Sequence, residues 1–263
     1  MPDIFEAVVP FSRERMSTEQ MCRMILDSGQ VELRDIAAGE LPFEYSASKP
    51  GDLRFGPGYI LIKALVGQDE GFFPLVNQLA WRIVDAGLQF DAICGNVSGG
   101  MIPGYLLKLY LTYIWRKPVR YIYAREMRKA HGSREMLVGV DNNPSIQDGM
   151  VFGDLEELVN NAQTTCNAAL TLRAAGFRCE HALTILDYDN VDARARRADI
   201  GLTQISLVTL PELLARAREV RRWPDEVIDD YLSYLDGPAA WRERNMDAIQ
   251  RAIQEKEQEA HHA

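Results

Sequence analysis

The chain has 263 residues, of which 47% are hydrophobic and 25% are charged, and its formal net charge at pH 7 is −9. This length allows one large α/β domain with additional segments, and the composition is that of a globular protein. The acidic balance argues against a general binder of nucleic acids or membrane surfaces. There is neither a long apolar run nor a signal-peptide pattern, so we expect a cytoplasmic protein.

The four cysteines are Cys22, Cys94, Cys166 and Cys179, which lie far apart and form no CxxC pair. Cysteine-based metal sites and redox-active pairs usually bring these residues close together in the sequence. We therefore expect buried, reduced thiols and no metal site built from the protein's own side chains.

The N-terminal part is predicted to begin with an amphipathic helix. Ser17 and Gln20 match the capping-box pattern of a helix start, and Gly29 marks the end of the helix. Residues 30–58 are rich in Gly, Pro and Ser and predict short strands and turns. The apolar residues 59–66 predict a strand, and the apolar spacing over 72–86 predicts a helix.

From residue 92 onward the predicted elements alternate. Strands are expected at 92–95, 119–124, 149–153, 181–187 and 204–208, and helices at 102–113, 161–175, 191–198 and 210–220. Strands separated by helices of this length pair in parallel through right-handed crossovers, with helices on both faces of the sheet. Trp223-Pro224 then breaks the pattern, and helices are expected at about 225–235 and 238–260.

We therefore predict an α/β fold, in which a parallel sheet is flanked by helices. Residues 1–66 would form an N-terminal helix and a small hood segment, and residues 67–222 the α/β core. Residues 223–263 would form a helical appendage that packs on the domain or on a partner subunit.

Two segments indicate a site for a heavily phosphorylated small molecule. Residues 93–103 predict a short strand, a Gly-rich turn and the start of a helix, where Ser98, Gly99 and Gly100 offer donors to a diphosphate. Residues 123–132, Tyr-Ala-Arg-Glu-Met-Arg-Lys-Ala-His-Gly, predict a strand that opens into a basic loop able to neutralise a leaving pyrophosphate.

Each segment also has a purely structural interpretation, because a Gly-Gly pair serves in ordinary turns and a basic run is often a solvated loop. Four candidate segments, 95–100, 125–139, 154–165 and 187–190, follow predicted strands. Ligands of open α/β sheets bind beyond the carboxyl ends of the strands, so this convergence favours a binding site.

The order and spacing of these motifs resemble the orotate phosphoribosyltransferases of the type I phosphoribosyltransferase family, from about residue 20 to about residue 241. Residues 53–59, Leu-Arg-Phe-Gly-Pro-Gly-Tyr, are similar to the family's early substrate segment. Residues 95–103 are similar to its pyrophosphate loop, and residues 123–132 to its catalytic loop.

The resemblance implies a glycosyltransferase of pyrimidine biosynthesis with a type I phosphoribosyltransferase-like fold. Such an enzyme transfers ribose-5-phosphate from phosphoribosyl pyrophosphate to orotate or a related pyrimidine base, with Mg²⁺, and releases pyrophosphate. It also implies a homodimer, in which the catalytic loop reaches into the neighbouring subunit. The residues implied are Arg125, Lys129 and His131 for pyrophosphate, Ser98, Gly99 and Gly100 for the diphosphate, and Arg54 and Tyr59 near the base.

The ribose-phosphate motif departs from the family pattern, which is a strand ending in Asp-Asp, two further residues, and Thr-x-Gly-x-Ser/Thr. Aligned on its strand, Gly153 replaces the first Asp, Asp154 alone remains as the catalytic carboxylate, and the following loop is longer and lacks its Gly. Thr164 and Thr165 still offer hydroxyls to the 5-phosphate at a helix start. Glu156 or Glu157 replaces the lost carboxylate, or residues 156–159 form an extra helical turn.

Two further departures concern the substrates. Glu126 stands in place of the loop lysine that follows Arg125, and Tyr188 stands where the family usually carries an arginine that recognises orotate. Tyr188 is therefore a third candidate for base binding. Two hypotheses remain open: an orotate-type phosphoribosyltransferase, or a non-catalytic protein of the same fold that binds a nucleotide or phosphate ligand in a regulatory role.

Overall fold

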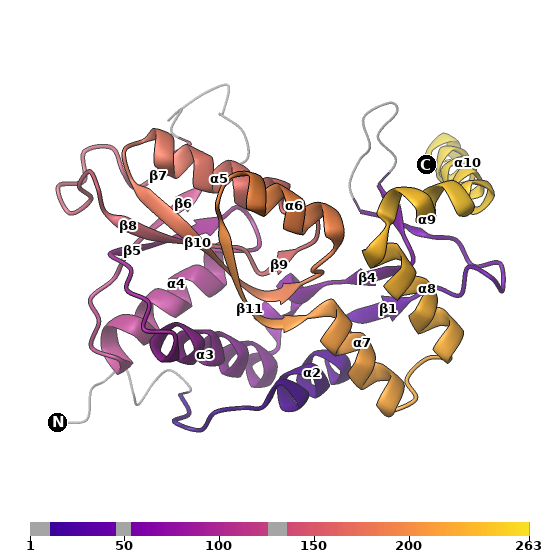
Figure 1. Ribbon diagram of the computed structural model, residues 1–263, viewed down its shortest axis with the longest axis horizontal. Coiled ribbons are helices and arrows are strands. Elements are labelled where there is room, and N and C mark those ends of the chain that lie inside the picture. The colour runs from indigo at the N-terminus through magenta and orange to yellow at the C-terminus, as the bar shows by residue number, and fades with distance from the viewer. Residues whose placement is uncertain (1–10, 46–53, 126–135, 263) are drawn as a thin grey trace.

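The computed structural model describes residues 11–45, 54–125 and 136–262 (Figure 1). Its centre is a seven-stranded sheet with the strand order β11-β10-β8-β5-β6-β7, and the short strand β9 pairs with β10. Two small antiparallel sheets, β1–β4 and β2–β3, lie to one side of it. We call these two small sheets the hood.

The strands of the central sheet are β5 (Ala92–Asn96), β6 (Arg120–Ala124), β7 (Leu137–Val138), β8 (Val151–Leu155), β9 (Leu158–Val159), β10 (Arg178–Asp187) and β11 (Thr203–Thr209). Those of the hood are β1 (Val31–Leu33), β2 (Phe43–Glu44), β3 (Phe55–Gly56) and β4 (Gly58–Ile60). The α-helices are α2 (Thr18–Asp27), α3 (Asp69–Asp85), α4 (Met101–Leu109), α5 (Gln163–Ala174), α6 (Val191–Asp199), α7 (Leu210–Glu219), α8 (Asp225–Asp236), α9 (Pro238–Arg244) and α10 (Met246–His262).

The pairing of the central strands is parallel except between β6 and β7. The register aligns the strand ends, because Asn96 pairs with Ala124, and Leu155 lies between Gly95 and Leu183. The segments that follow β5, β6 and β8 therefore start at one edge of the sheet. The predicted α/β fold with a largely parallel sheet is confirmed.

Helices cover both faces of the sheet, and each face has its own apolar core (Figure 1). On one face, α3 and α4 pack on the strands beside α2 and α7, and this larger core continues into α8. On the other face lie α5 and α6, over a smaller core that is rich in alanine and also contains cysteine, phenylalanine and branched aliphatic side chains. The strands β5, β8 and β10 are buried because both of their faces are covered.

The predicted capping box is present: the Ser17 hydroxyl accepts from the Gln20 amide, and the Gln20 side chain accepts from the Ser17 amide. The predicted strand over 59–66 is wrong for most of its length. After β4 the chain turns into a 3-10 helix, η1 (Ile62–Gly67). Ile62 and Leu65 are three residues apart and both buried, which fits the three-residue period of a 3-10 helix.

Three other boundaries differ from the prediction. The helix over 102–113 ends as α4 and continues as a π-helix, η2 (Tyr110–Ile114). The segment 238–260 is two helices, because α9 ends at Arg244 and α10 begins at Met246. The alternative of a helical turn over 156–159 is also wrong, since Leu158 and Val159 form β9 and pair with β10.

The helices α8, α9 and α10, which we call the appendage, pack against the hood (Figure 1). Tyr45 of the hood, Tyr188 after β10, and Tyr231, Tyr234 and Trp241 of the appendage form a chain of ring contacts with centroids 5.5–6.2 Å apart. At the far end, Lys256 Nζ lies 2.6 Å from Glu44 Oε2. Aromatic packing thus joins the hood, the sheet and the appendage.

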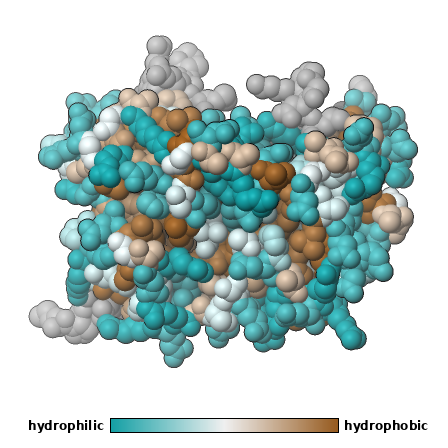
Figure 2. Space-filling view, in the orientation of Figure 1, coloured by the Kyte–Doolittle hydropathy of each residue, from teal (hydrophilic) through white to brown (hydrophobic). Residues whose placement is uncertain are grey.

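Figure 2 shows hydrophilic side chains over most of one face, with apolar side chains in separate groups between them. This surface is in keeping with the composition of the chain. Within the part of the chain that the structure describes, no helix combines the length and the apolar character needed to cross a bilayer.

The appendage offers a test of this packing. Trp241 is 0% exposed, and its Nε1 donates to Asp230 Oδ1 at 2.9 Å. Replacing it, Trp241→Ala, is expected to lower the free energy of unfolding by about 3–5 kcal/mol, because a large cavity remains and Asp230 loses a hydrogen bond. Urea unfolding followed by circular dichroism measures the loss. Trp223→Ala, at a half-buried position, is the matched control and should cost clearly less; equal losses would contradict this account.

Candidate active site

A cavity of about 910 Å³ lies at the carboxyl edge of the sheet, where ligands of open α/β sheets bind. Its walls come from the hood, the ends of β5, β6 and β8, the helices α5 and α6, and the appendage. The lining residues are Tyr45, Arg54, Asn96, Ala124, Arg125, Met136, Glu156, Leu158, Val159, Asn160, Asn161, Ala162, Gln163, Thr164, Thr165, Asn167, Ala168, Thr171, Asn190, Asp192, Arg196, Tyr234, Pro238 and Arg242.

Two adjacent strands deliver polar residues to the floor of the cavity. Asn96 ends β5, and Arg125 follows β6. The backbone N–H of Arg125 donates to the carbonyl of Met136 at 2.9 Å, and both residues line the cavity. The residues on both sides of the segment 126–135 therefore lie at the cavity. Lys129 and His131 lie on this segment, outside the described residues.

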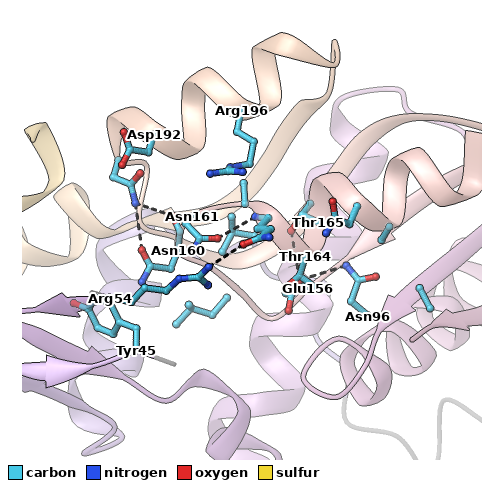
Figure 3. Close-up of a pocket in the computed structure, with 18 of the residues that line it drawn as sticks. Tyr45, Arg54, Asn96, Glu156, Asn160, Asn161, Thr164, Thr165, Asp192 and Arg196 are labelled. Atoms are coloured by element: carbon cyan, nitrogen blue, oxygen red, sulfur yellow. Dashed lines mark hydrogen bonds between the residues drawn. The ribbon is translucent and has the colours of Figure 1, made fainter. Parts of the chain in front are cut away.

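An acidic pair follows β8 directly. The Glu156 Oε2 atom accepts from Asn96 Nδ2 at 3.3 Å and from Thr165 Oγ1 at 3.4 Å, and Glu156 lines the cavity (Figure 3). The Glu157 carboxylate instead lies over the turn after β5, where a Cβ on Gly99 would come within 2.0 Å of it. Burial raises the pKa of Glu157, and the charge of Lys63 opposes that rise. The two glutamates thus face different sides of the loop.

The loop before α5 has the geometry of an anion site. Ala162 precedes the helix with φ +58°, in the left-handed region, and has no side-chain oxygen that could cap it. The first-turn amides of a helix lack partners inside the helix and attract anions, and the hydroxyls of Thr164 and Thr165 stand beside them. Figure 3 shows Arg196 of α6 above this loop.

Two contacts hold the loop in place. Asn190 caps α6 by accepting from the Ala193 amide at 2.9 Å, and its Nδ2 donates to the carbonyl of Asn160 at 2.7 Å. From the hood, Arg54 Nη2 donates to Gln163 Oε1 at 3.3 Å. The hood and α6 are therefore tied to opposite sides of the same loop.

The cavity has two distinct ends (Figure 3). Asn96, Glu156 and Thr165 meet at one end, where β5 and β8 finish. Tyr45 of the hood and Asp192 of α6 lie at the other end, with Arg54 and the loop 160–164 between them. The structure thus brings Arg54, Arg125, Thr164 and Thr165 together around one cavity.

The turn at Ser98, Gly99 and Gly100 adjoins the cavity without lining it. Ser98 is exposed, whereas Gly100 is buried, and a Cβ on Gly100 would lie 2.0 Å from the carbonyl oxygen of Leu155. A side chain at Gly100 is excluded because the turn lies directly against the end of β8. This close approach brings the turn beside the acidic pair.

The two tyrosines predicted to bind the base lie elsewhere. Tyr188 is 2% exposed, and its ring packs between those of Tyr45 and Tyr231 in the aromatic chain. Tyr59 pairs with Glu32 in the β1–β4 sheet, with its ring 5.6 Å from that of Phe43. Neither residue lines the cavity.

Asp154 lies inside β8 rather than at its end. It pairs with Cys94 and Ala182 on the neighbouring strands and is 0% exposed. Neither of its carboxylate oxygens has a hydrogen-bond partner among the described residues. Burial raises the pKa of Asp154 well above its ordinary value, the charge of Glu156 adds to this rise, and the nearby Asn96 amide opposes it. Burial thus favours the protonated form of this carboxyl group, which does not line the cavity.

Several residues of the cavity were not anticipated from the sequence: Tyr45, Gln163, Arg196, Tyr234 and Arg242. The Asn-Asn pair before Gln163 is a turn signal that could have located the loop. Arg196 and Arg242 carry no comparable signal, because each is one of several arginines on the helical segments at 191–198 and 238–260. Only the packing of α6 and α9 directs them to the cavity.

The burial of Asp154 predicts a pH-dependent stability. Because its pKa is raised in the folded state, the protein loses stability as the pH rises from about 4, where the unfolded chain deprotonates first. The variant Asp154→Asn removes this titration, so its stability relative to the wild type should increase by up to about 1.4 kcal/mol per pH unit. Urea unfolding at pH 4, 5.5 and 7 measures the difference. A difference that stays constant, or that shrinks with pH, would contradict the assignment.

No family model matches the chain. It is, however, 26% identical to the orotate phosphoribosyltransferase of Pyrobaculum aerophilum over 190 residues, 71% of this chain and 87% of that protein. Among solved structures, orotate phosphoribosyltransferase from Aeropyrum pernix matches with a TM-score of 0.58 at 20% identity, over 78% of this chain and 99% of that one.

The UMP synthase of Leishmania donovani matches with a TM-score of 0.64 at 18% identity, over 84% of this chain. The match spans only 42% of that longer protein. These matches confirm the resemblance seen in the sequence: the chain is similar to orotate phosphoribosyltransferases over most of its length and has the type I phosphoribosyltransferase fold.

Proposed function

We propose that the protein transfers ribose-5-phosphate from phosphoribosyl pyrophosphate to orotate or a closely related pyrimidine and releases pyrophosphate. One observation carries this proposal: the carboxylate of Glu156, the left-handed loop residue Ala162 and the N-terminus of α5 follow one another along the wall of a single cavity. The similarity to orotate phosphoribosyltransferases over most of the chain supports it. Nothing favours the alternative of a non-catalytic ligand-binding protein.

The geometry of this segment supports a different alignment with the ribose-phosphate motif. In our proposal Glu156 and Glu157 take the place of Asp-Asp, and residues 160–164 take that of Thr-x-Gly-x-Ser/Thr. Ala162 then occupies the position of the glycine, which agrees with its φ of +58°. The loop has the length of the motif, and Thr164 supplies the final hydroxyl. Asp154 and Gly153 become interior residues of β8.

The roles of the residues follow from their places in the cavity. Glu156 would hold the ribose hydroxyls, and the amides and hydroxyls at the start of α5 would hold the 5-phosphate, with Arg196 as a nearby cation. Arg125, at the root of the segment 126–135, would stabilise the pyrophosphate as negative charge builds on it. Lys129 and His131 remain proposed partners in that task, and closure over the cavity would exclude water.

In this proposal Mg²⁺ binds together with phosphoribosyl pyrophosphate. Within the described residues, no cluster of three or more His, Cys, Asp or Glu side chains could hold a metal ion. The carboxylate of Glu156 suits a Mg²⁺ ion that keeps most of its ligands from water and phosphate oxygens. When bound, the ion would neutralise charge on the leaving pyrophosphate.

The proposal extends to location and assembly. The four cysteines are free and buried, as expected for a protein that works in the reducing cytoplasm. The resemblance implies a homodimer, and α4 offers a surface for it, because Ile102 and Tyr105 are 52% and 50% exposed, one turn apart. Phosphoribosyl pyrophosphate and the base would be its small-molecule partners.

The proposed reaction is tested by incubating the protein with phosphoribosyl pyrophosphate, Mg²⁺ and orotate, and following orotate consumption by its absorbance. Glu156→Gln should lower kcat/KM by about ten- to a hundredfold, because the cavity loses its carboxylate beside Thr165. Glu180→Gln, at an exposed ion pair with Arg178, is the matched control and should retain activity.

In the same assay, Asp154→Asn should keep most of the activity, because residue 154 does not reach the cavity. A large loss in Asp154→Asn together with normal activity in Glu156→Gln would reverse the alignment proposed for the acidic pair. A wild-type protein that consumes no orotate at millimolar substrate would rule out the proposed reaction.

The dimer is tested by Tyr105→Glu, which places a charge on the exposed face of α4. Light scattering coupled to gel filtration should give twice the monomer mass for the wild type and the monomer mass for the variant. Leu170→Glu, at a 45% exposed position on α5, is the control and should remain dimeric. A monomeric wild-type protein, or a dimeric Tyr105→Glu variant, would contradict the assignment of this surface.

A further inference from the structure

The appendage contributes an arginine to the cavity that has no function in the fold. Arg242 of α9 is half-buried and lines the cavity with Tyr234 and Pro238. It forms no hydrogen bond or ion pair with the residues at 11–45, 54–125 and 136–262. A cation that lines a cavity and keeps all its N–H donors available is placed to bind an anionic ligand.

The helix that carries Arg242 is firmly held. Trp241, the preceding residue, is fully buried and hydrogen-bonded to Asp230. Arg244, two residues further on, donates to Ser233 Oγ at 2.8 Å and lies 3.3 Å from Asp230 Oδ1. Trp241 and Arg244 therefore anchor α9 to α8, whereas Arg242 lines the cavity. An arginine presented in this way by rigid neighbours is suited to recognition.

The surroundings of Arg242 are aromatic. Tyr45 and Tyr234 both line the cavity, with ring centroids 6.0 Å apart. Burial raises the pKa of Tyr234 to about 12, and the charge of Arg242 opposes this rise. Planar rings beside a planar cation fit a flat, anionic heterocycle rather than a compact phosphate.

The phosphate groups of the substrate have other binding positions. The start of α5 and Arg196 serve the 5-phosphate in our proposal, and Arg125 serves the pyrophosphate. Arg242 lines the cavity from the appendage, and Tyr45 lines it beside the hood. Arg54 shares this region but already contacts Gln163. Arg242 is thus the cation that remains available to bind the base.

We propose that Arg242 of the C-terminal appendage binds the carboxylate of the pyrimidine base and so sets the base specificity of the enzyme. This inference rests on the proposed function and adds the appendage to the substrate site. A guanidinium can bind a carboxylate through two parallel N–H···O hydrogen bonds, which gives orientation as well as affinity. Tyr188, at the position where the family's arginine is expected, is buried in the aromatic chain and leaves this task open.

The test compares orotate with uracil, which lacks the carboxylate. Arg242→Gln should lower kcat/KM for orotate by about ten- to a hundredfold, leave the KM for phosphoribosyl pyrophosphate within about twofold, and reduce the preference for orotate over uracil by a similar factor. Arg242→Lys should recover part of the loss, because the charge remains and the two-point geometry does not.

Arg244→Ala is the matched control, since it alters the same helix outside the cavity and should leave the orotate-to-uracil ratio unchanged. Binding of orotate to each variant, measured by calorimetry in the presence of pyrophosphate, gives a readout that does not depend on turnover. Weaker binding by Arg242→Gln than by Arg244→Ala supports the inference.

The outcomes separate the two claims. A wild-type protein that binds orotate without consuming it overturns the proposed reaction, while the calorimetric comparison still decides the role of Arg242. An unchanged orotate-to-uracil ratio in Arg242→Gln, or a loss expressed only in the KM for phosphoribosyl pyrophosphate, overturns the inference about Arg242. A wild-type protein that does not bind orotate overturns both.

Discussion

The position of β8 between β5 and β10 is the constraint on which the site depends. Parallel pairing in this register makes three strands end at one edge, so that the turn after β5, the root of the segment after β6 and the acidic pair after β8 become neighbours. The contact is close enough that Gly100 has no room for a side chain beside Leu155. Small shifts in this pairing would separate the polar groups that line the cavity.

The same pairing explains why one strand carries both a buried acid and a pair of accessible ones. Asp154 faces the small core beneath α5, and burial there raises its pKa well above the ordinary value. Two residues later the chain has left the strand, and Glu156 reaches Asn96 and Thr165 at the cavity wall. Asp154 and Glu156 are both carboxylic acids, and their environments differ because Asp154 lies inside the strand and Glu156 lies beyond its end.

The hood and the appendage complete the cavity from the opposite side. They are joined to the sheet by the aromatic chain from Tyr45 through Tyr188 to Trp241, and by the contact between Arg54 and Gln163. Since the tyrosines fill the space where the base-binding residues were expected, recognition of the base moves to the residues around them. The proposed part played by Arg242 follows from this rearrangement.

The sequence by itself determined the alternating strands and helices, the capping box at Ser17, and the resemblance that led to the fold, because these depend on local periodicity and motif order. It did not determine which carboxylates face the ligand. The spacing of Asp154, Glu156 and Glu157 is compatible with two alignments, and only the pairing of Leu155 with Gly95 and Leu183 shows where β8 ends. Likewise, Tyr188, Arg196 and Arg242 acquire their surroundings through contacts between elements far apart in the chain, which no local pattern encodes.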